Sequence, residues 1–259
     1  MKQLLLGAIL VALAGGCAAT VSQEDTEGAR IHYDIAVANL NEGRLRRALR
    51  ELMRAVELDP NMPKVHNALG LVYHAMNRSA ASLEHYERAV QLDPEYSEAY
   101  NNLGTLLLDE GRYDEAIAAF KKALGDILYA TPALAEGNMG WAYYQLGNRK
   151  KALKHLRNAV ATSPKFCRGY EWLARIGLDT DNTELVVKNC QRFTKYCAEA
   201  PEVAKTLAAD YINKMRYYLA MAYLRQGERD LARAVLDTCA QGGEGQYAGQ
   251  CEESLSSLD

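Results

Sequence analysis

Histidine is the residue type of this 259-residue chain best suited to acid–base catalysis or metal binding, yet the spacing of its histidines suits neither. His32, His66, His74, His85 and His155 include no His-Glu-x-x-His sequence and no partner arrangement that indicates a nucleophile. The sequence also lacks a glycine-rich phosphate loop and closely spaced zinc ligands. We therefore expect no catalysis, cofactor, metal or small-molecule substrate, and a function in binding.

Cysteine offers a second kind of chemistry, because disulfides persist in exported proteins. Beyond Cys17, the chain has an odd number of cysteines, so at least one thiol stays free or pairs between molecules: Cys167, Cys190, Cys197, Cys239 and Cys251. Cys167 and Cys197 would lie at the same end of one helical hairpin, which makes them a feasible pair. Cys239 and Cys251 flank a glycine-rich segment and could join the tail to the last helix. The spacing leaves the connectivity open, and Cys190 fits a buried apolar position.

The elements that must position these residues are set by an internal repeat of 34 residues. Shifting the sequence by this period places Leu69-Gly70 on Leu103-Gly104, Tyr86 on Phe120 and Ala89 on Ala123. A leucine–glycine pair, a later aromatic residue and a small residue three positions beyond it are typical of tetratricopeptide repeats. The pattern predicts an all-α solenoid of about six helix-turn-helix repeats that form a right-handed superhelix, each repeat having a helix A and a helix B.

The predicted domain boundaries follow this period. The repeats are placed at residues 29–62, 63–96, 97–132, 133–166, 167–200 and 213–246, so that the solenoid spans residues 29–246. The third is extended by two residues, and the fifth is degenerate because Cys190 stands where an aromatic residue is expected. Residues 247–259 are predicted to form a polar C-terminal tail.

The N-terminal residues predict export and lipid anchoring. Residues 1–16 combine one basic residue with a short apolar run and small residues, which are the proportions of a signal peptide. The sequence Leu-Ala-Gly-Gly-Cys ending at Cys17 resembles a bacterial lipobox, although its leucine lies one place early. We predict that Cys17 is lipidated, that Ala18 after it directs the protein to the outer membrane, and that residues 17–28 form a flexible tether. The alternatives are a secretory peptide with a chance cysteine and a cytosolic protein with an apolar start.

A partner-binding surface is expected on the concave face. Solenoids of this kind present residues 2, 5, 9, 12 and 13 of each helix A there, which gives Tyr33, Val37, Leu40, Asn67, Leu71, His74, Asn101, Thr105, Leu108, Trp141 and Tyr144. Exposed apolar residues mark interaction sites, so Leu71, Leu108 and Trp141 are expected to receive side chains. Asn67 and Asn101 are expected to bond a partner's backbone. The alternative is that these residues only pack across the superhelix.

A lipobox, a short tether and six repeats together resemble the type IV pilus biogenesis and stability lipoproteins, the pilotins of the pilus secretin. This resemblance implies an outer-membrane lipoprotein, facing the periplasm, that helps secretin subunits assemble into their channel. A scaffold for another cell-envelope machine remains the alternative. Acidic Glu98 and uncharged Tyr33 disfavour a clamp for a partner's C-terminal carboxylate. A net charge of −3 predicts no nucleic-acid partner, since a nucleic-acid footprint would need a clustered basic surface.

Overall fold

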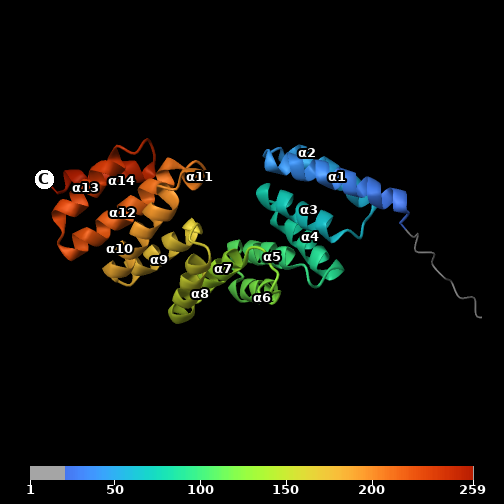
Figure 1. Ribbon diagram of the computed structural model, residues 1–259, viewed down its shortest axis with the longest axis horizontal. Helices are drawn as coiled ribbons and strands as arrows, with labels where there is room; N and C mark the ends of the chain where they lie inside the picture. Colours follow the sequence, from blue (N-terminus) through green and yellow to red (C-terminus); the bar gives the residue numbers. More distant parts are fainter. Residues whose placement is uncertain (1–20, 259) are drawn as a thin grey trace, which may run out of the picture.

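A computed structural model describes residues 21–258, and this part of the chain is helical throughout, without strands (Figure 1). It contains α1 (Gln23–Asn41), α2 (Leu45–Leu58), α3 (Pro63–Ala75), α4 (Ser79–Leu92), α5 (Ser97–Asp109), α6 (Tyr113–Ala123), α7 (Pro132–Gln145), α8 (Arg149–Thr162), α9 (Cys167–Asp179), α10 (Thr183–Phe193), a π-helical turn η1 (Thr194–Ala198), α11 (Pro201–Ala204), α12 (Ala209–Gln226), α13 (Arg229–Ala240) and α14 (Gln246–Ser256). Among the described residues, no helix is long and apolar enough to cross a membrane.

The helices pair as antiparallel hairpins that stack along an arc, which confirms the predicted solenoid. Successive hairpins are α1/α2, α3/α4, α5/α6, α7/α8 and α9/α10, and the two helices within each hairpin contact each other more extensively than successive hairpins do. In Figure 1, α3, α5, α7 and α9 line the inner side of the arc, whereas α6 and α8 lie on its outer side. No single hairpin can cover its apolar faces, so each repeat depends on its neighbours.

The leucine–glycine pair of the repeat has a direct steric reason. A Cβ atom added to Gly70 would lie 2.4 Å from the ring of Tyr86, and one on Gly104 would lie 2.7 Å from the ring of Phe120. Both rings are fully buried. Helix A therefore approaches helix B closely only because these positions lack a side chain.

A residue with positive φ ends the turn between helices A and B in successive repeats. Gly43, Gly111 and Gly147 occupy it with φ of 71–76°, and Asn77 and Asp181 take its place with φ of 57° and 53°. Asparagine and aspartate tolerate this left-handed conformation better than other non-glycine residues. The turn thus keeps its shape where the glycine of the repeat is missing.

The start of the solenoid differs from the prediction. The expected tether of residues 17–28 ends early, because α1 begins at Gln23 rather than near residue 29. The Ser22 hydroxyl caps this helix by accepting a hydrogen bond from the Asp25 backbone nitrogen at 3.0 Å, and Glu24 and Asp25 place negative charge in its first turn. The predicted lipidation site Cys17 and the predicted signal peptide of residues 1–16 lie outside the described residues.

The fifth repeat is closed by a disulfide. Cys167 begins α9 and Cys197 lies in η1, and the two form one of the proposed bonds with a Cα–Cα distance of 5.9 Å. Cys190 is a buried free thiol, and burial raises its pKa. The sixth repeat starts earlier than residue 213, because α12 begins at Ala209 and the Tyr211 ring meets Phe193 edge-on.

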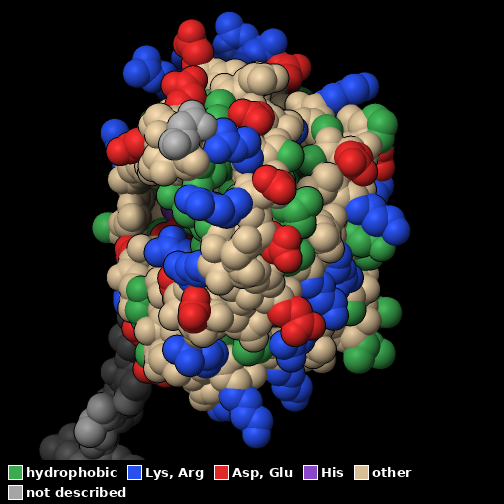
Figure 2. All heavy atoms as spheres, turned by 90° about the vertical axis from the view of Figure 1, so that its left-hand side faces the viewer, with side chains coloured by type: hydrophobic (Ala, Val, Ile, Leu, Met, Phe, Trp, Pro, Cys, Tyr) green, Lys and Arg blue, Asp and Glu red, His purple; other side chains and the backbone are tan. Residues whose placement is uncertain are grey.

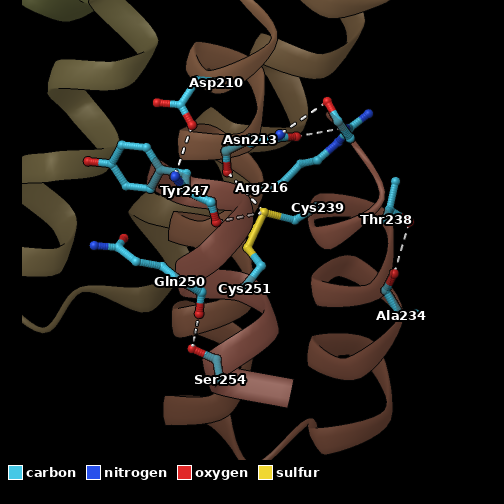
Figure 3. The surroundings of a disulfide bond; sticks show 11 residues. Asp210, Asn213, Arg216, Ala234, Thr238, Cys239, Tyr247, Gln250, Cys251 and Ser254 are labelled. Atoms are coloured by element: carbon cyan, nitrogen blue, oxygen red, sulfur yellow. Dashed lines mark hydrogen bonds between the residues drawn. A yellow bond between two sulfur atoms is a disulfide. The ribbon is translucent and has the colours of Figure 1, made fainter. Parts of the chain in front are cut away.

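The C-terminal residues are helical rather than a polar tail, so the prediction for residues 247–259 is wrong in the described part. Figure 3 shows Cys239 of α13 bonded to Cys251 of α14, with Cα atoms 6.0 Å apart. The Asp210 carboxylate accepts a hydrogen bond from the Tyr247 backbone nitrogen at 2.9 Å and so ties the start of α14 to α12. The side of α14 that carries Ala248 and Cys251 is buried, which stabilises the helix despite its polar composition.

Candidate partner-binding face

The inner face of the arc consists of side chains from α1, α3, α5, α7, α9 and α12. Its predicted members are mostly half-buried, and Leu71 is the most exposed at 39%. Leu40, Leu108, Trp141 and Tyr144 pack partly against the core and leave part of each side chain accessible. The face therefore keeps an apolar component at its surface.

Hydrogen bonds between successive A helices occupy the polar groups of this face. The side-chain amide of Asn102 donates to the Asn67 carbonyl oxygen at 3.0 Å, and that of Asn138 donates to the Thr105 hydroxyl at 3.2 Å. Each bond joins residue 6 of one repeat to residue 5 or 9 of the repeat before it. Thr105 is therefore a connection between repeats rather than a free polar group.

A second row of contacts runs along the ends of the A helices. His74 Nε2 lies 3.1 Å from the Asp109 carboxylate, and the Tyr144 hydroxyl donates to the Asp179 carboxylate at 2.5 Å. Burial and the bond to Asp179 raise the pKa of Tyr144. Both contacts link residue 12 of one repeat to residue 13 of the next, so this row fixes the spacing of adjacent repeats.

The prediction for Asn67 and Asn101 needs correction. These side chains are only 6% and 8% exposed. The Asn67 amide donates to the Tyr96 hydroxyl at 3.3 Å and also accepts from Asn102, which leaves it unavailable to a partner's backbone. The side-chain oxygen of Asn101 is buried and has no hydrogen-bond partner among residues 21–258. The half-exposed amide at this level is that of Asn102, one residue further along α5.

The N-terminal end of the face has a tyrosine cluster next to a carboxylate. Burial raises the pKa of Tyr33, and the negative charges of Glu98 and Asp34 raise it further. Burial, with a smaller effect from Tyr33, likewise raises the pKa of Tyr96 to about 12. Both phenols therefore stay protonated at neutral pH and can donate hydrogen bonds.

Two tryptophans stack in the middle of the face. The rings of Trp141 and Trp172 lie 5.3 Å apart and are nearly parallel, and Phe166 meets Trp172 edge-on at 6.0 Å. The Arg168 guanidinium lies 5.8 Å from the Trp172 ring. Trp172 is not among the residues predicted for this face, because it is residue 6 of its repeat, outside the positions expected there. Trp172 stands at the same repeat position as Asn102 and Asn138, and this shared position is the sequence signal that could have placed it on the face.

The C-terminal end of the face is charged. Glu171 and Lys214 form an ion pair between α9 and α12, and Arg175 pairs with Asp179 on its own helix. Burial works against the charge of Lys214, but the bond to Glu171 raises the pKa of the ammonium group overall. The face thus ends in ion pairs on the C-terminal side of its stacked tryptophans.

The histidines serve to join helices. His32 lies 2.8 Å from Glu51, and His155 lies 3.0 Å from Glu136, so each connects helix A to helix B of its own repeat. His66 Nε2 donates to the Pro60 carbonyl oxygen at 3.0 Å, and His66 Nδ1 lies 3.0 Å from Nδ1 of His85. Within the described part of the chain, no group of three or more His, Cys, Asp or Glu side chains could hold a metal ion.

Comparison with protein-family models identifies the repeat. Models described as tetratricopeptide repeat match residues 67–135, 107–176 and 216–238, and one described as TPR repeat matches residues 38–77. These models describe a repeat that typically mediates protein interactions, and none of them is of a catalytic family. A search of curated proteins gave no match.

Solved structures with the same fold cover nearly the whole chain. PilW, described as a widely conserved type IV pilus biogenesis factor, has a TM-score of 0.74 and 20% identity, over 86% of this chain and 97% of PilW. PilF of Pseudomonas aeruginosa has a TM-score of 0.74 and 18% identity, over 90% of this chain and 99% of PilF. A tetratricopeptide repeat protein from Parabacteroides merdae has a TM-score of 0.61 and 14% identity, over 89% of this chain and 84% of that protein. At these identities the likeness establishes the fold.

Proposed function

Since this chain belongs to the tetratricopeptide repeat proteins, we propose that it is a non-catalytic lipoprotein of the outer membrane that binds type IV pilus secretin subunits and promotes their assembly. Cys17 carries the lipid, the solenoid faces the periplasm, and the inner face holds a segment of the secretin until the subunits join. Full-length similarity of fold to two pilus proteins supports the pilus assignment, together with the lipobox and tether.

The observation that carries the binding role is the contrast between polar and apolar groups on the inner face. Asn67, Thr105 and Tyr144 are bonded to neighbouring repeats, whereas Leu71 and Leu108 remain partly exposed beside them. Complete burial of a fully exposed leucine contributes about 1.5–3 kcal/mol, so covering the 39% of Leu71 that is exposed contributes about 0.6–1.2 kcal/mol. An extended segment of the partner would place apolar side chains on these leucines and on Trp141.

The first test asks whether the protein supports secretin assembly. The gene is deleted, and outer-membrane extracts are run on a denaturing gel that preserves heat-resistant secretin multimers. We expect the multimers to disappear while monomer persists, and the wild-type gene to restore them. Complementation with Cys17→Ala measures whether the lipid is required. Unchanged multimers in the deletion strain would contradict the proposal and favour a scaffold of another envelope machine.

A second test places the binding surface. Complementation with Leu71→Glu and Leu108→Glu together should fail to restore multimers, and adding Trp141→Glu should not be needed. This double variant spares Trp141 because its stack with Trp172 also stabilises the fold. The control, Met53→Glu with Leu231→Glu, changes two comparably exposed apolar residues on α2 and α13 and should restore multimers. Equal failure of both variants, each with normal helical content, would argue against the inner face.

A further inference from the structure

Two neighbouring outer helices carry a run of basic side chains that the binding of a partner on the inner face does not use. Helix α8 has lysine or arginine at each of its charged positions, and α10 adds two more across a hollow. We call this set the basic ridge: Lys150, Lys151, Lys154, Arg157, Lys188 and Arg192.

The ridge is continuous across the two helices. A hollow of about 380 Å³ is lined by Arg157 of α8 and by Lys188 and Arg192 of α10, with Leu173 of α9 at its base. Arg157 also lines a second hollow along α8, together with Lys150, Lys151 and Lys154. The part on α8 alone extends about 10 Å along the helix axis. The cations therefore form one surface rather than isolated charges.

These cations lack carboxylate partners within the described chain. No member of the ridge forms an ion pair with another residue of the range 21–258, although Lys151 lies over the Tyr143 ring and Arg192 over the Tyr170 ring. Among the residues that line the two hollows, Glu184 supplies the one carboxylate. The whole chain has a net charge of −3, so the positive charge is concentrated locally. In Figure 2, Lys and Arg side chains predominate over the lower part of the molecule, where Figure 1 places α8 and α10.

We propose that the basic ridge binds the anionic surface of a phospholipid bilayer. The centres of protein interfaces are depleted of charge and rich in aromatic residues. The two hollows instead contain no aromatic side chain, and five of the six cations are on exposed, flexible side chains. Such a surface suits the phosphate groups of many lipids better than one complementary polypeptide. The ridge adds to the lipid anchor at Cys17 but does not depend on it.

A membrane-bound ridge orients the solenoid. With α8 and α10 against the headgroups, the A helices on the other side of these repeats face away from the bilayer. The inner face then remains open to a partner in the aqueous space. Each Lys or Arg near an anionic membrane strengthens binding about fivefold, and the effect falls within a Debye length of the surface.

The test is flotation of the chain beginning at Ala18 with lipid vesicles. This chain retains every described helix and excludes attachment through an acylated Cys17. We expect it to float with vesicles of phosphatidylcholine and phosphatidylglycerol in equal parts, but not with phosphatidylcholine alone, and high salt should release it. Lys150→Glu, Lys154→Glu and Arg157→Glu together should weaken binding by at least about 100-fold. The matched control, Lys64→Glu, Lys121→Glu and Lys122→Glu, changes the net charge equally on other exposed sites and should stay within a few-fold of wild type.

Three results would overturn the proposal. The first is that the wild-type chain fails to bind anionic vesicles. The second is that both triple variants lose binding equally. The third is that the chain binds poly-glutamate and not vesicles, which would indicate an acidic polypeptide as partner. Circular dichroism of both variants checks that they fold. The assay contains no secretin, so its failure would leave the proposed assembly role unaffected.

Discussion

The close approach of α3 and α4 at Gly70 allows a prediction with a worked magnitude. In Gly70→Ala, the new Cβ atom would lie 2.4–2.9 Å from three ring atoms of Tyr86, whose side chain is fully buried. Overpacking of this kind costs about 1–3 kcal/mol, and the tight ring contacts place this site near the upper end. Alanine returns about 1 kcal/mol through its higher helix propensity. We therefore expect Gly70→Ala to reduce the free energy of unfolding by about 2 kcal/mol.

Gly249→Ala is the matched control. Gly249 also lies inside a helix, but a Cβ atom there would meet nothing within 4 Å. Here the propensity gain should remain, so we expect a stabilisation of about 0.5–1 kcal/mol. The two variants carry the same chemical change and should differ in sign.

Urea unfolding followed by far-ultraviolet circular dichroism measures both effects. Repeating Gly70→Ala in a Tyr86→Leu background tests the cause, because removal of the ring should replace the cost of the alanine with a stabilisation of about 0.5–1 kcal/mol, as in Gly249→Ala. If Gly70→Ala is as stable as wild type, or if its cost is unchanged without the Tyr86 ring, the steric explanation of the leucine–glycine pair is refuted.

Two further predictions concern titration and cross-linking. Burial lowers the pKa of His66 and His85, so their contribution to stability is complete above about pH 6.5 and is lost as the pH falls. Between about pH 7.5 and pH 5, the melting temperature of His66→Gln should therefore fall less than that of wild type. Cys239→Ser with Cys251→Ser opens a loop with a sequence separation of 12 and should destabilise α14 by about 3 kcal/mol, measured by hydrogen exchange, whereas an equal loss in α4 would contradict a local effect.

The sequence predicted the middle of the solenoid well because its signals are local and repeated. Gly70 with Tyr86, and Gly104 with Phe120, each mark a contact between the two helices of one hairpin. The 34-residue period repeats this signal along the chain. The prediction was weaker at both ends, where no neighbouring repeat supplies the pattern. Ser22 as a helix cap was readable, but the burial of Ala248 and Cys251 depends on α12 and α13, which the composition of residues 247–259 does not reveal.

The candidate face shows a different limit of the sequence. Residue positions in the repeat predict an inner-face location for Leu71, Asn67 and Trp141, but the distance between successive repeats decides which of them stay accessible. That distance brings Asn102 to Asn67 and Trp172 to Trp141. Contacts between repeats are set by the superhelix and not by the sequence of one hairpin, so the burial of Asn67 and Asn101 could not be foreseen.

The separate hydrophobic clusters have a mechanical consequence. The apolar core of α1, α2 and α3 forms one cluster, distinct from the cluster that runs from α4 to α12, and both disulfides lie between residues 167 and 251. If the chain were held at its N-terminus while a bound partner pulled on it, the force would act first on α1 and α2, which contain no disulfide. These helices would yield as a unit and lengthen the link, while the cross-linked repeats keep their shape. We therefore expect the N-terminal end of the solenoid to extend under a lower force than the cross-linked C-terminal end.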